Sequence, residues 1–103
     1  MITLNNIEVG KKFAQPLYSI NYTIDDVENG QRYVILPPGI PTRSQVINAV
    51  ITEEYPLDKM EAVINNYLLD PTDEDAKAEM DAMQDFRKAA KKFADEVIEE
   101  INK

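Results

Sequence analysis

The sequence predicts an α+β fold, in which an N-terminal β-hairpin precedes two short helices and one long C-terminal amphipathic helix. Apolar and polar residues alternate between Tyr18 and Ile24, which is typical of a half-buried strand. After the proline-rich stretch "LPPGIP", apolar residues recur every three or four positions, as on one face of a helix. No glycine or proline follows Pro71, so the last helix is expected to run unbroken. We expect one domain over residues 1–103, with a hairpin region at 1–36 and a three-helix region at 42–103.

Two strands and a turn make up the predicted hairpin. The stretch "LYSINYTI" places Tyr18, Ile20, Tyr22 and Ile24 on one face, and "QRYVI" supplies the second strand. Between them, Asn29-Gly30 is a favoured pair for a two-residue type I′ turn. Such a turn would place Ile24 opposite Ile35 and Asp26 opposite Tyr33. Because a lone hairpin is marginal in water, it needs a third strand or a helix on its apolar face, and the stretch "MITLNNIEV" could supply a short strand.

Capping signals mark the starts of the two short helices. Thr42 fits an N-cap and Gln45 stands three residues later, which together form a capping box. This helix must end before Pro56, because proline disfavours helical geometry in the residue that precedes it. Asp58 and Glu61 are the corresponding cap pair predicted for the second helix. The predicted apolar faces are Val46, Ile47, Val50 and Ile51 in the first helix, and Met60, Val63, Ile64, Tyr67 and Leu68 in the second.

The long helix is predicted to begin with Asp70 as its N-cap and Pro71 at its first position. Asp73, Glu74 and Asp75 would then fall in the first turn, where the positive end of the helix favours acidic residues. At about 100° per residue, the apolar residues form one stripe on the helix surface. The members of this stripe are Ala76, Met80, Met83, Phe86, Ala90, Phe93, Ala94, Val97, Ile98 and Ile101.

The length of this helix leaves two arrangements open. About thirty residues span about 45 Å, which exceeds the roughly 33 Å diameter of a compact 100-residue domain. The two short helices could lie end to end along the long one, with the hairpin covering the remainder. Alternatively, the last turns stay exposed and bind a protein partner or a second copy in a weak homodimer. The candidate interface for the second arrangement is Phe93, Val97, Ile98, Ile101 and Arg87.

Composition and charge exclude several classes of function. The net charge is −8, so direct binding to nucleic acid or to an anionic membrane is not expected. The chain has no cysteine and no histidine, which removes the commonest general base and the thiolate and imidazole metal ligands. The N-terminal residues lack the pattern of a signal peptide, and no apolar run approaches the length of a membrane span. We therefore expect a cytoplasmic protein.

No catalytic, cofactor-binding or metal-ligating motif stands out, so an enzyme is not expected. The cluster "DPTDED" lacks the glycine and the glutamate that a calcium loop of the EF-hand type requires at its sixth and twelfth positions. The two short helices carry few bases for a DNA-reading motif. An ordinary acidic helix N-terminus and ordinary core packing explain both features.

The sequence therefore favours a non-enzymatic protein-interaction or assembly module. It would present either the edge of its hairpin, which is a template for strand pairing, or its long helix, which could fill a groove. The alternative is an acidic regulator that occupies a basic nucleic-acid-binding site on another protein. Asp81, Asp85, Asp95 and Glu99 would form its acidic face, which is interrupted by Lys77, Lys88, Lys91 and Lys92.

The stretch "PTRSQVINAVITEEYPLDKMEAVINNYLL" resembles small uncharacterised proteins that are encoded in bacterial phage and prophage-like elements. The features that carry the resemblance are a short helix, a turn around a tyrosine and a second helix with a pair of asparagines near its end. The resemblance covers about a third of the chain and implies an accessory or assembly role. It assigns no catalytic or binding residue to this sequence.

Overall fold

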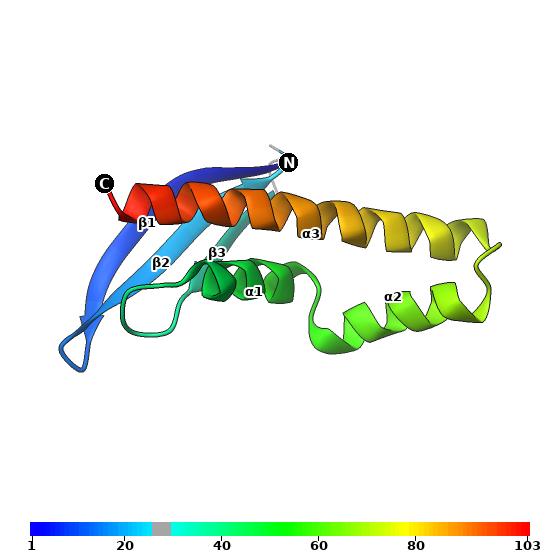
Figure 1. The fold of residues 1–103 in the computed structure, drawn as a ribbon, viewed down its shortest axis with the longest axis horizontal. Coiled ribbons are helices and arrows are strands. Elements are labelled where there is room, and N and C mark those ends of the chain that lie inside the picture. The colour runs from blue at the N-terminus through cyan, green and yellow to red at the C-terminus, as the bar shows by residue number, and fades with distance from the viewer. Residues whose placement is uncertain (26–29) are drawn as a thin grey trace.

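The computed structural model describes residues 1–25 and 30–103 of the chain. A three-stranded antiparallel sheet precedes three helices, the last of them long, which confirms the α+β prediction and the third strand (Figure 1). The elements are β1 (Ile2–Lys12), β2 (Gln15–Ile24), β3 (Gln31–Ile35), α1 (Arg43–Glu54), α2 (Leu57–Leu69) and α3 (Glu74–Ile101). Among the described residues, no helix is both long and apolar enough to cross a membrane.

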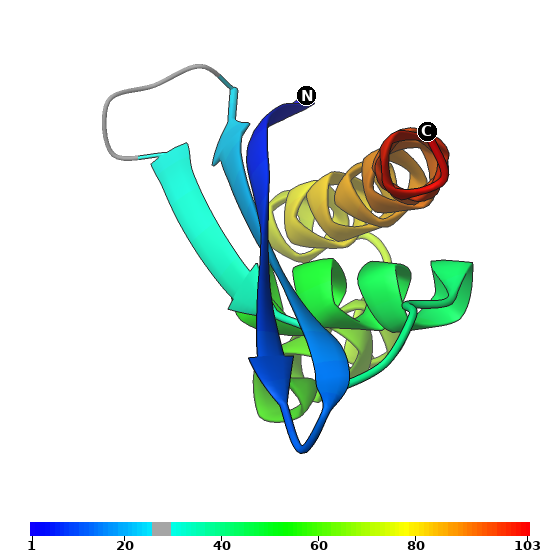
Figure 2. The ribbon, with the colours of Figure 1, turned by 90° about the vertical axis from the view of Figure 1, so that its left-hand side faces the viewer.

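β2 lies at the centre of the sheet, with β1 and β3 as its two edges. The helices α1 and α3 lie on one side of this sheet (Figure 2). The predicted alternation on β2 is observed, because Ile20 and Tyr22 are fully buried beneath the helices. The opposite face is open and polar along β1 and β2, where Asn5 donates a hydrogen bond to the Thr23 hydroxyl at 2.7 Å. The sheet is thus covered on one face only.

A β-bulge keeps the apolar residues of β1 on the covered face. The pairing with β2 shifts between Leu4 and Asn6, so Asn5 is an extra residue. Leu4 lies opposite Tyr22, and Ile7 lies opposite Ile20. Without the bulge, the three-residue spacing from Leu4 to Ile7 would turn one of them toward solvent.

The register between β2 and β3 differs from the prediction. Ile35 lies opposite Ser19, whereas Ile24 pairs with Ile2 of β1. The last pair of this ladder is Thr23 with Gln31, so the predicted two-residue loop is wrong. The prediction also placed Asp26 opposite Tyr33 and Asn29 in the turn, and both Asp26 and Asn29 lie outside the described residues.

Burial explains the observed register. A shift by one residue exchanges the two faces of a strand. The predicted pairing would have put Ile35 on the covered face. The observed pairing instead puts Val34 opposite Ile20, and Val34 and Leu36 are both buried. The predicted pairing would have turned Tyr33 inward together with Ile35, whereas the observed pairing buries two aliphatic side chains and leaves the Tyr33 hydroxyl accessible to water.

The core lies between the covered face of the sheet and the helices α1 and α3. The rings of Tyr22 and Phe93 meet with their centroids 5.4 Å apart, a distance at which tilted aromatic pairs attract. The fully buried large side chains are Tyr22, Phe93, Ile20, Leu36, Met83, Val46, Val50 and Val97. All of them except Met83 belong to one cluster, which therefore joins the sheet to both helices.

The capping box of α1 is confirmed. The Thr42 side chain accepts a hydrogen bond from the Gln45 backbone N–H at 3.2 Å, and the Gln45 side chain accepts one from the Thr42 N–H at 3.0 Å. The helix ends at Glu54, before Pro56, as predicted. The cap pair predicted for α2 is wrong, because Pro56 is its N-cap and no side chain caps it. The chain is already helical at Leu57, which places Asp58 inside the first turn.

The N-cap of α3 is Asp73 and not Asp70. The Asp73 carboxylate accepts hydrogen bonds from the backbone N–H groups of Asp75 and Ala76. Asp70 instead accepts bonds from the hydroxyl and the N–H of Thr72, and these bonds lower the pKa of its carboxyl. Asp70 thus holds the turn that follows α2, and α3 begins only at Glu74.

The two short helices lie end to end along α3 (Figure 1), which is the first of the two arrangements that the sequence left open. α1 and the sheet pack against the C-terminal half of α3, and α2 packs against its N-terminal half as a projecting arm. The molecule accordingly measures 51 × 27 × 21 Å. Leu68 and Leu69 at the end of this arm are exposed, so the predicted apolar face of α2 is only partly covered.

The chain itself covers most of the apolar stripe at the end of α3, so the stripe does not form the exposed patch of the second arrangement. Phe93 and Val97 are buried within the chain's own core, and Ile98 and Ile101 pack against it with part of their surface exposed. Arg87 is half-buried on the same helix. The sheet and α1 together cover the buried part of this stripe.

Replacement of Phe93 by alanine should lower the free energy of unfolding by about 3–5 kcal/mol, because it opens a cavity between Tyr22 and α3. Chemical denaturation measures this difference. Leu69→Ala is the control, since Leu69 is 87% exposed and should change stability by less than about 0.5 kcal/mol. Equal losses in the two variants would contradict the described core.

Replacement of Tyr22 by phenylalanine should stabilise the protein. The Tyr22 hydroxyl is buried and finds no hydrogen-bond partner among the described residues, and such a group costs about 1–3 kcal/mol. We expect a gain of about 1 kcal/mol at neutral pH in chemical denaturation. Tyr33→Phe removes a hydroxyl from an exposed residue and should be neutral. A loss of stability in Tyr22→Phe would reveal a partner for the hydroxyl.

The same variant should also change the response to alkaline pH. Burial, followed by the charge of Glu53, raises the pKa of the Tyr22 hydroxyl in the folded protein. The hydroxyl ionises at about pH 10 in the unfolded chain and only at a higher pH in the folded protein. Its ionisation therefore leaves stability unchanged below about pH 10 and lowers it as the pH rises further. Between about pH 10 and 12, Tyr22→Phe should lose less stability than the wild type in denaturation series at stepped pH. Parallel curves would contradict the raised pKa.

Candidate functional site

The free edge of β3 exposes backbone hydrogen-bonding groups. The Leu36 N–H donates to the Tyr18 carbonyl at 2.9 Å, and hydrogen-bonded pairs alternate along an antiparallel ladder. Val34 is therefore bonded to β2, whereas the N–H and C=O groups of Tyr33 and Ile35 point away from it. No strand pairs with this edge among the described residues. These four groups are available to a further strand.

The side chains on β3 leave this edge open. Tyr33 and Ile35 are 48% and 58% exposed. Sheet edges are commonly protected by lysine, proline or a covering segment, yet β3 itself contains neither lysine nor proline. Pro37 follows the strand and limits further pairing at one end only. The edge therefore presents an aromatic and a β-branched side chain beside its open backbone groups.

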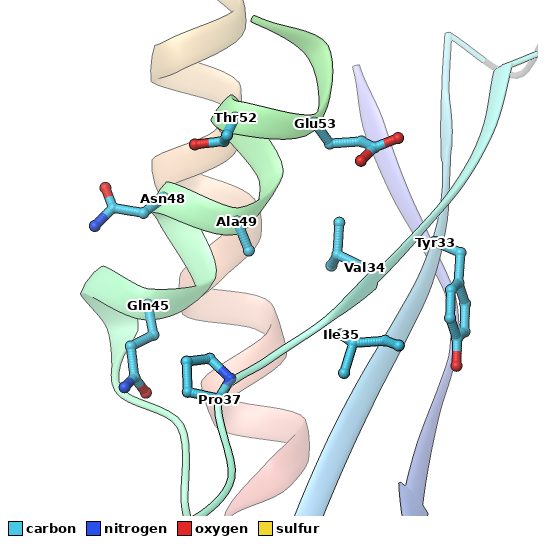
Figure 3. Close-up of a pocket in the computed structure, with 9 residues that line it drawn as sticks. All are labelled: Tyr33, Val34, Ile35, Pro37, Gln45, Asn48, Ala49, Thr52 and Glu53. Carbon is cyan, nitrogen blue, oxygen red and sulfur yellow. The ribbon is translucent and has the colours of Figure 1, made fainter. Parts of the chain in front are cut away.

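A groove runs between this edge and α1 (Figure 3). Its volume is about 630 Å³. Val34 and Ala49 face each other across it, and Glu53 points toward β3 from the end of α1 (Figure 3). The remaining lining residues are Tyr33, Ile35, Pro37, Gln45, Asn48 and Thr52. The groove thus combines an apolar floor with a polar wall on the helix.

Glu53 is the one residue with a formal charge among the described residues that line this groove. The neighbouring Glu54 accepts a hydrogen bond from the Arg32 guanidinium at 3.3 Å, so its charge is partly compensated. Glu53 has no such ion pair within the described part of the chain. With a net charge of −8 on the whole protein, the groove favours a basic side chain.

The tip of the β1–β2 hairpin is a second exposed feature, and the sequence did not predict it. Phe13 and Ala14 form the two-residue connection between the strands, with φ values of 52° and 65°. The Phe13 side chain is 89% exposed, and Val9 nearby is 61% exposed. Lys11 and Lys12 precede the turn. The sequence feature that could have drawn attention to this tip is the absence of any acidic residue between Glu8 and Asp25.

The described residues contain no group of three or more acidic side chains that could hold a metal ion. None of the predicted interface residues on α3 lines the groove, and four of them lie in the core or pack against it: Phe93, Val97, Ile98 and Ile101. The site is therefore built from β3 and α1, which sequence reasoning named only as a hairpin edge and a helix.

Comparisons with protein-family models, with curated proteins and with solved structures find no match to this chain. The function is therefore inferred from the geometry of the sheet edge and its groove.

Ile35→Pro should leave the fold intact, because the N–H that proline removes points to the open edge. Val34→Pro is the matched control on the adjacent residue, where the N–H is bonded to β2, and it should destabilise the protein by about 1–3 kcal/mol, because it leaves a carbonyl of β2 without its donor. Thermal unfolding followed by circular dichroism compares the two variants. Equal destabilisation would contradict the assignment of Tyr33 and Ile35 to the free edge.

Proposed function

We propose that this protein is a non-enzymatic interaction module that binds an extended segment of a protein partner along β3. The observation that carries the proposal is the open backbone edge at Tyr33 and Ile35, which lies directly beside the groove against α1. In strand addition, backbone hydrogen bonds supply affinity and pockets for alternate side chains supply specificity. Both parts of this recognition mode are present here.

The backbone groups alone would give weak binding. Each hydrogen bond contributes a net 0.5–1.5 kcal/mol or so, and this must offset the cost of ordering the bound segment. Alternate side chains of the added strand would point toward α1, where Val34, Pro37 and Ala49 offer apolar contact. The groove therefore has to supply much of the affinity, and an aliphatic or aromatic side chain fits its floor.

Charge defines the preferred ligand further. Glu53 stands at one end of the groove, and the protein is strongly acidic. A lysine or arginine in the bound segment would meet the Glu53 carboxylate at close range. We therefore expect an extended segment that alternates apolar and polar residues and carries a basic residue.

The alternative, an acidic regulator of a nucleic-acid-binding protein, has less support. Asp95 on the proposed acidic face pairs with Arg43 of α1, and the lysines of α3 alternate with its acids along the exposed side. A mimic of a phosphate backbone needs a continuous array of negative charge. The accessory role that the phage-type resemblance implies is compatible with the interaction module and stays a prediction.

Selection from a random nine-residue peptide library on immobilised wild-type protein tests the proposed function. We expect selected peptides with alternating apolar residues and a lysine or arginine, because these match the groove. Binding should be lost in Ile35→Pro, which obstructs strand addition. Glu53→Gln should weaken binding about three- to fivefold, as for a partly exposed ion pair, whereas Glu61→Gln on the arm should not. Peptides that bind Ile35→Pro as tightly as the wild type would contradict the proposal.

A further inference from the structure

The ligand chemistry deduced for the groove occurs in the chain itself. The hairpin tip, defined here as residues 9–13, has the sequence "VGKKF". It is extended up to Lys12, it carries two lysines, and its apolar side chains Val9 and Phe13 are largely exposed. We propose that the occupant of the groove is the hairpin tip of a second copy, so that copies join head to tail. This inference rests on the proposed function of the groove.

The hairpin tip also has an open backbone edge. Because Val34 and Leu36 bond to Ile20 and Tyr18, the alternate residues of β2 bond to β1. Those residues lie opposite Glu8, Gly10 and Lys12. The N–H and C=O groups of Val9 and Lys11 therefore point to the free side of β1, which is the other edge of the sheet. Two open strand edges can complete each other's hydrogen bonds, and the lysines that protect this edge against other strands would meet the Glu53 carboxylate in the groove.

The charges of the two surfaces are complementary. The hairpin tip carries Lys11 and Lys12, and the chain has no acid between Glu8 and Asp25. The groove carries Glu53, the one formal charge among the described residues that line it. At physiological salt, charges more than about 8 Å away are largely screened. The local positive charge of the tip therefore decides its interaction, despite the negative total.

The turn at the hairpin tip is closed by two residues that rarely adopt the backbone conformation it requires. Both turn residues have positive φ, a region that glycine and asparagine occupy more readily than phenylalanine or alanine. An Asn-Gly pair would close the same turn without strain. The chain instead holds an aromatic ring in solvent at this point. Strain of this kind is concentrated at functional positions. Insertion of Phe13 into a groove would explain why an aromatic residue is kept in this turn.

The tip cannot reach the groove of its own chain. β1 and β3 lie on opposite sides of β2, so the hairpin tip and the β3 groove belong to opposite edges of one sheet. A contact between them must join two molecules. Because the two surfaces differ, the contact is heterologous, and each bound copy leaves one free tip and one free groove. The expected product is an open chain of copies rather than a two-fold dimer.

Two full-length variants test this assembly. The tip variant combines Lys11→Glu, Lys12→Glu and Phe13→Ser, and the groove variant combines Ile35→Pro with Glu53→Lys. In sedimentation equilibrium, the mass of the wild type should rise with concentration and fall again at high salt. Each variant alone should stay at the monomer mass of 11.7 kDa. An equimolar mixture should reach twice that mass and no more, because only one tip and one groove remain intact.

Lys91→Glu combined with Lys92→Glu is the control. These lysines are exposed on α3, and their reversal changes the net charge by the same amount as reversal of the two tip lysines. This control should associate as the wild type does. Circular dichroism checks that every variant is folded.

Three results would overturn the inference. They are a wild type that is monomeric at every concentration, a tip variant that still self-associates, and a mixture that stays monomeric. A tip variant that associates while the groove variant does not would indicate isologous pairing of two β3 edges. The peptide selection separates this inference from the proposed function. Peptides that bind the groove of a strictly monomeric wild type would leave the groove function standing and remove the hairpin tip as its ligand.

Discussion

The packing of Tyr22 and Ile20 of β2 against Phe93 and Val97 of α3 is the contact on which the rest of the structure depends. All four side chains are fully or almost fully buried, and burial of each contributes about 1.5–3 kcal/mol. This contact fixes the C-terminal half of α3 on the sheet. The N-terminal half then extends beyond the sheet, where only α2 accompanies it. The elongated shape results from one helix that is longer than the sheet it covers.

One helix and its short neighbour cover one face of a three-stranded sheet, and this leaves both sheet edges open. On β1 the edge continues into the hairpin tip, which projects from the body with Phe13 at its end. On β3 the edge lies beside α1 and forms one wall of the groove. The opposite sheet face carries a polar network through Asn5, Asn21 and Gln31, and its exposed apolar side chains Tyr33 and Ile35 lie on β3, at the edge of the sheet. The open edges are therefore the surfaces best suited to binding.

Local signals in this sequence were sufficient where the interactions are local. The capping box at Thr42 involves residues three apart, so it could be predicted. The register of β3 could not, because Val34 and Ile35 are equally apolar and the helices decide which of them is buried. Asp70 and Asp73 are both suitable N-caps, and the turn after α2 decides between them. The free edge was foreseen as a binding surface, but its groove requires α1 beside β3.

The position of the lysines at the hairpin tip favours a binding role for this surface. An acidic protein gains solubility from its net charge, and bases scattered among the acids would only reduce the repulsion within the chain. Two adjacent lysines at the end of an exposed hairpin do not add to the negative net charge. They also do not separate neighbouring acids, because Glu8 is the nearest acid along the chain. The lysines lie beside the aromatic ring of Phe13, and the Nζ of Lys12 is 5.9 Å from the centroid of that ring. A surface of this composition fits an acidic, partly apolar groove, and the β3 groove of the same protein has that composition.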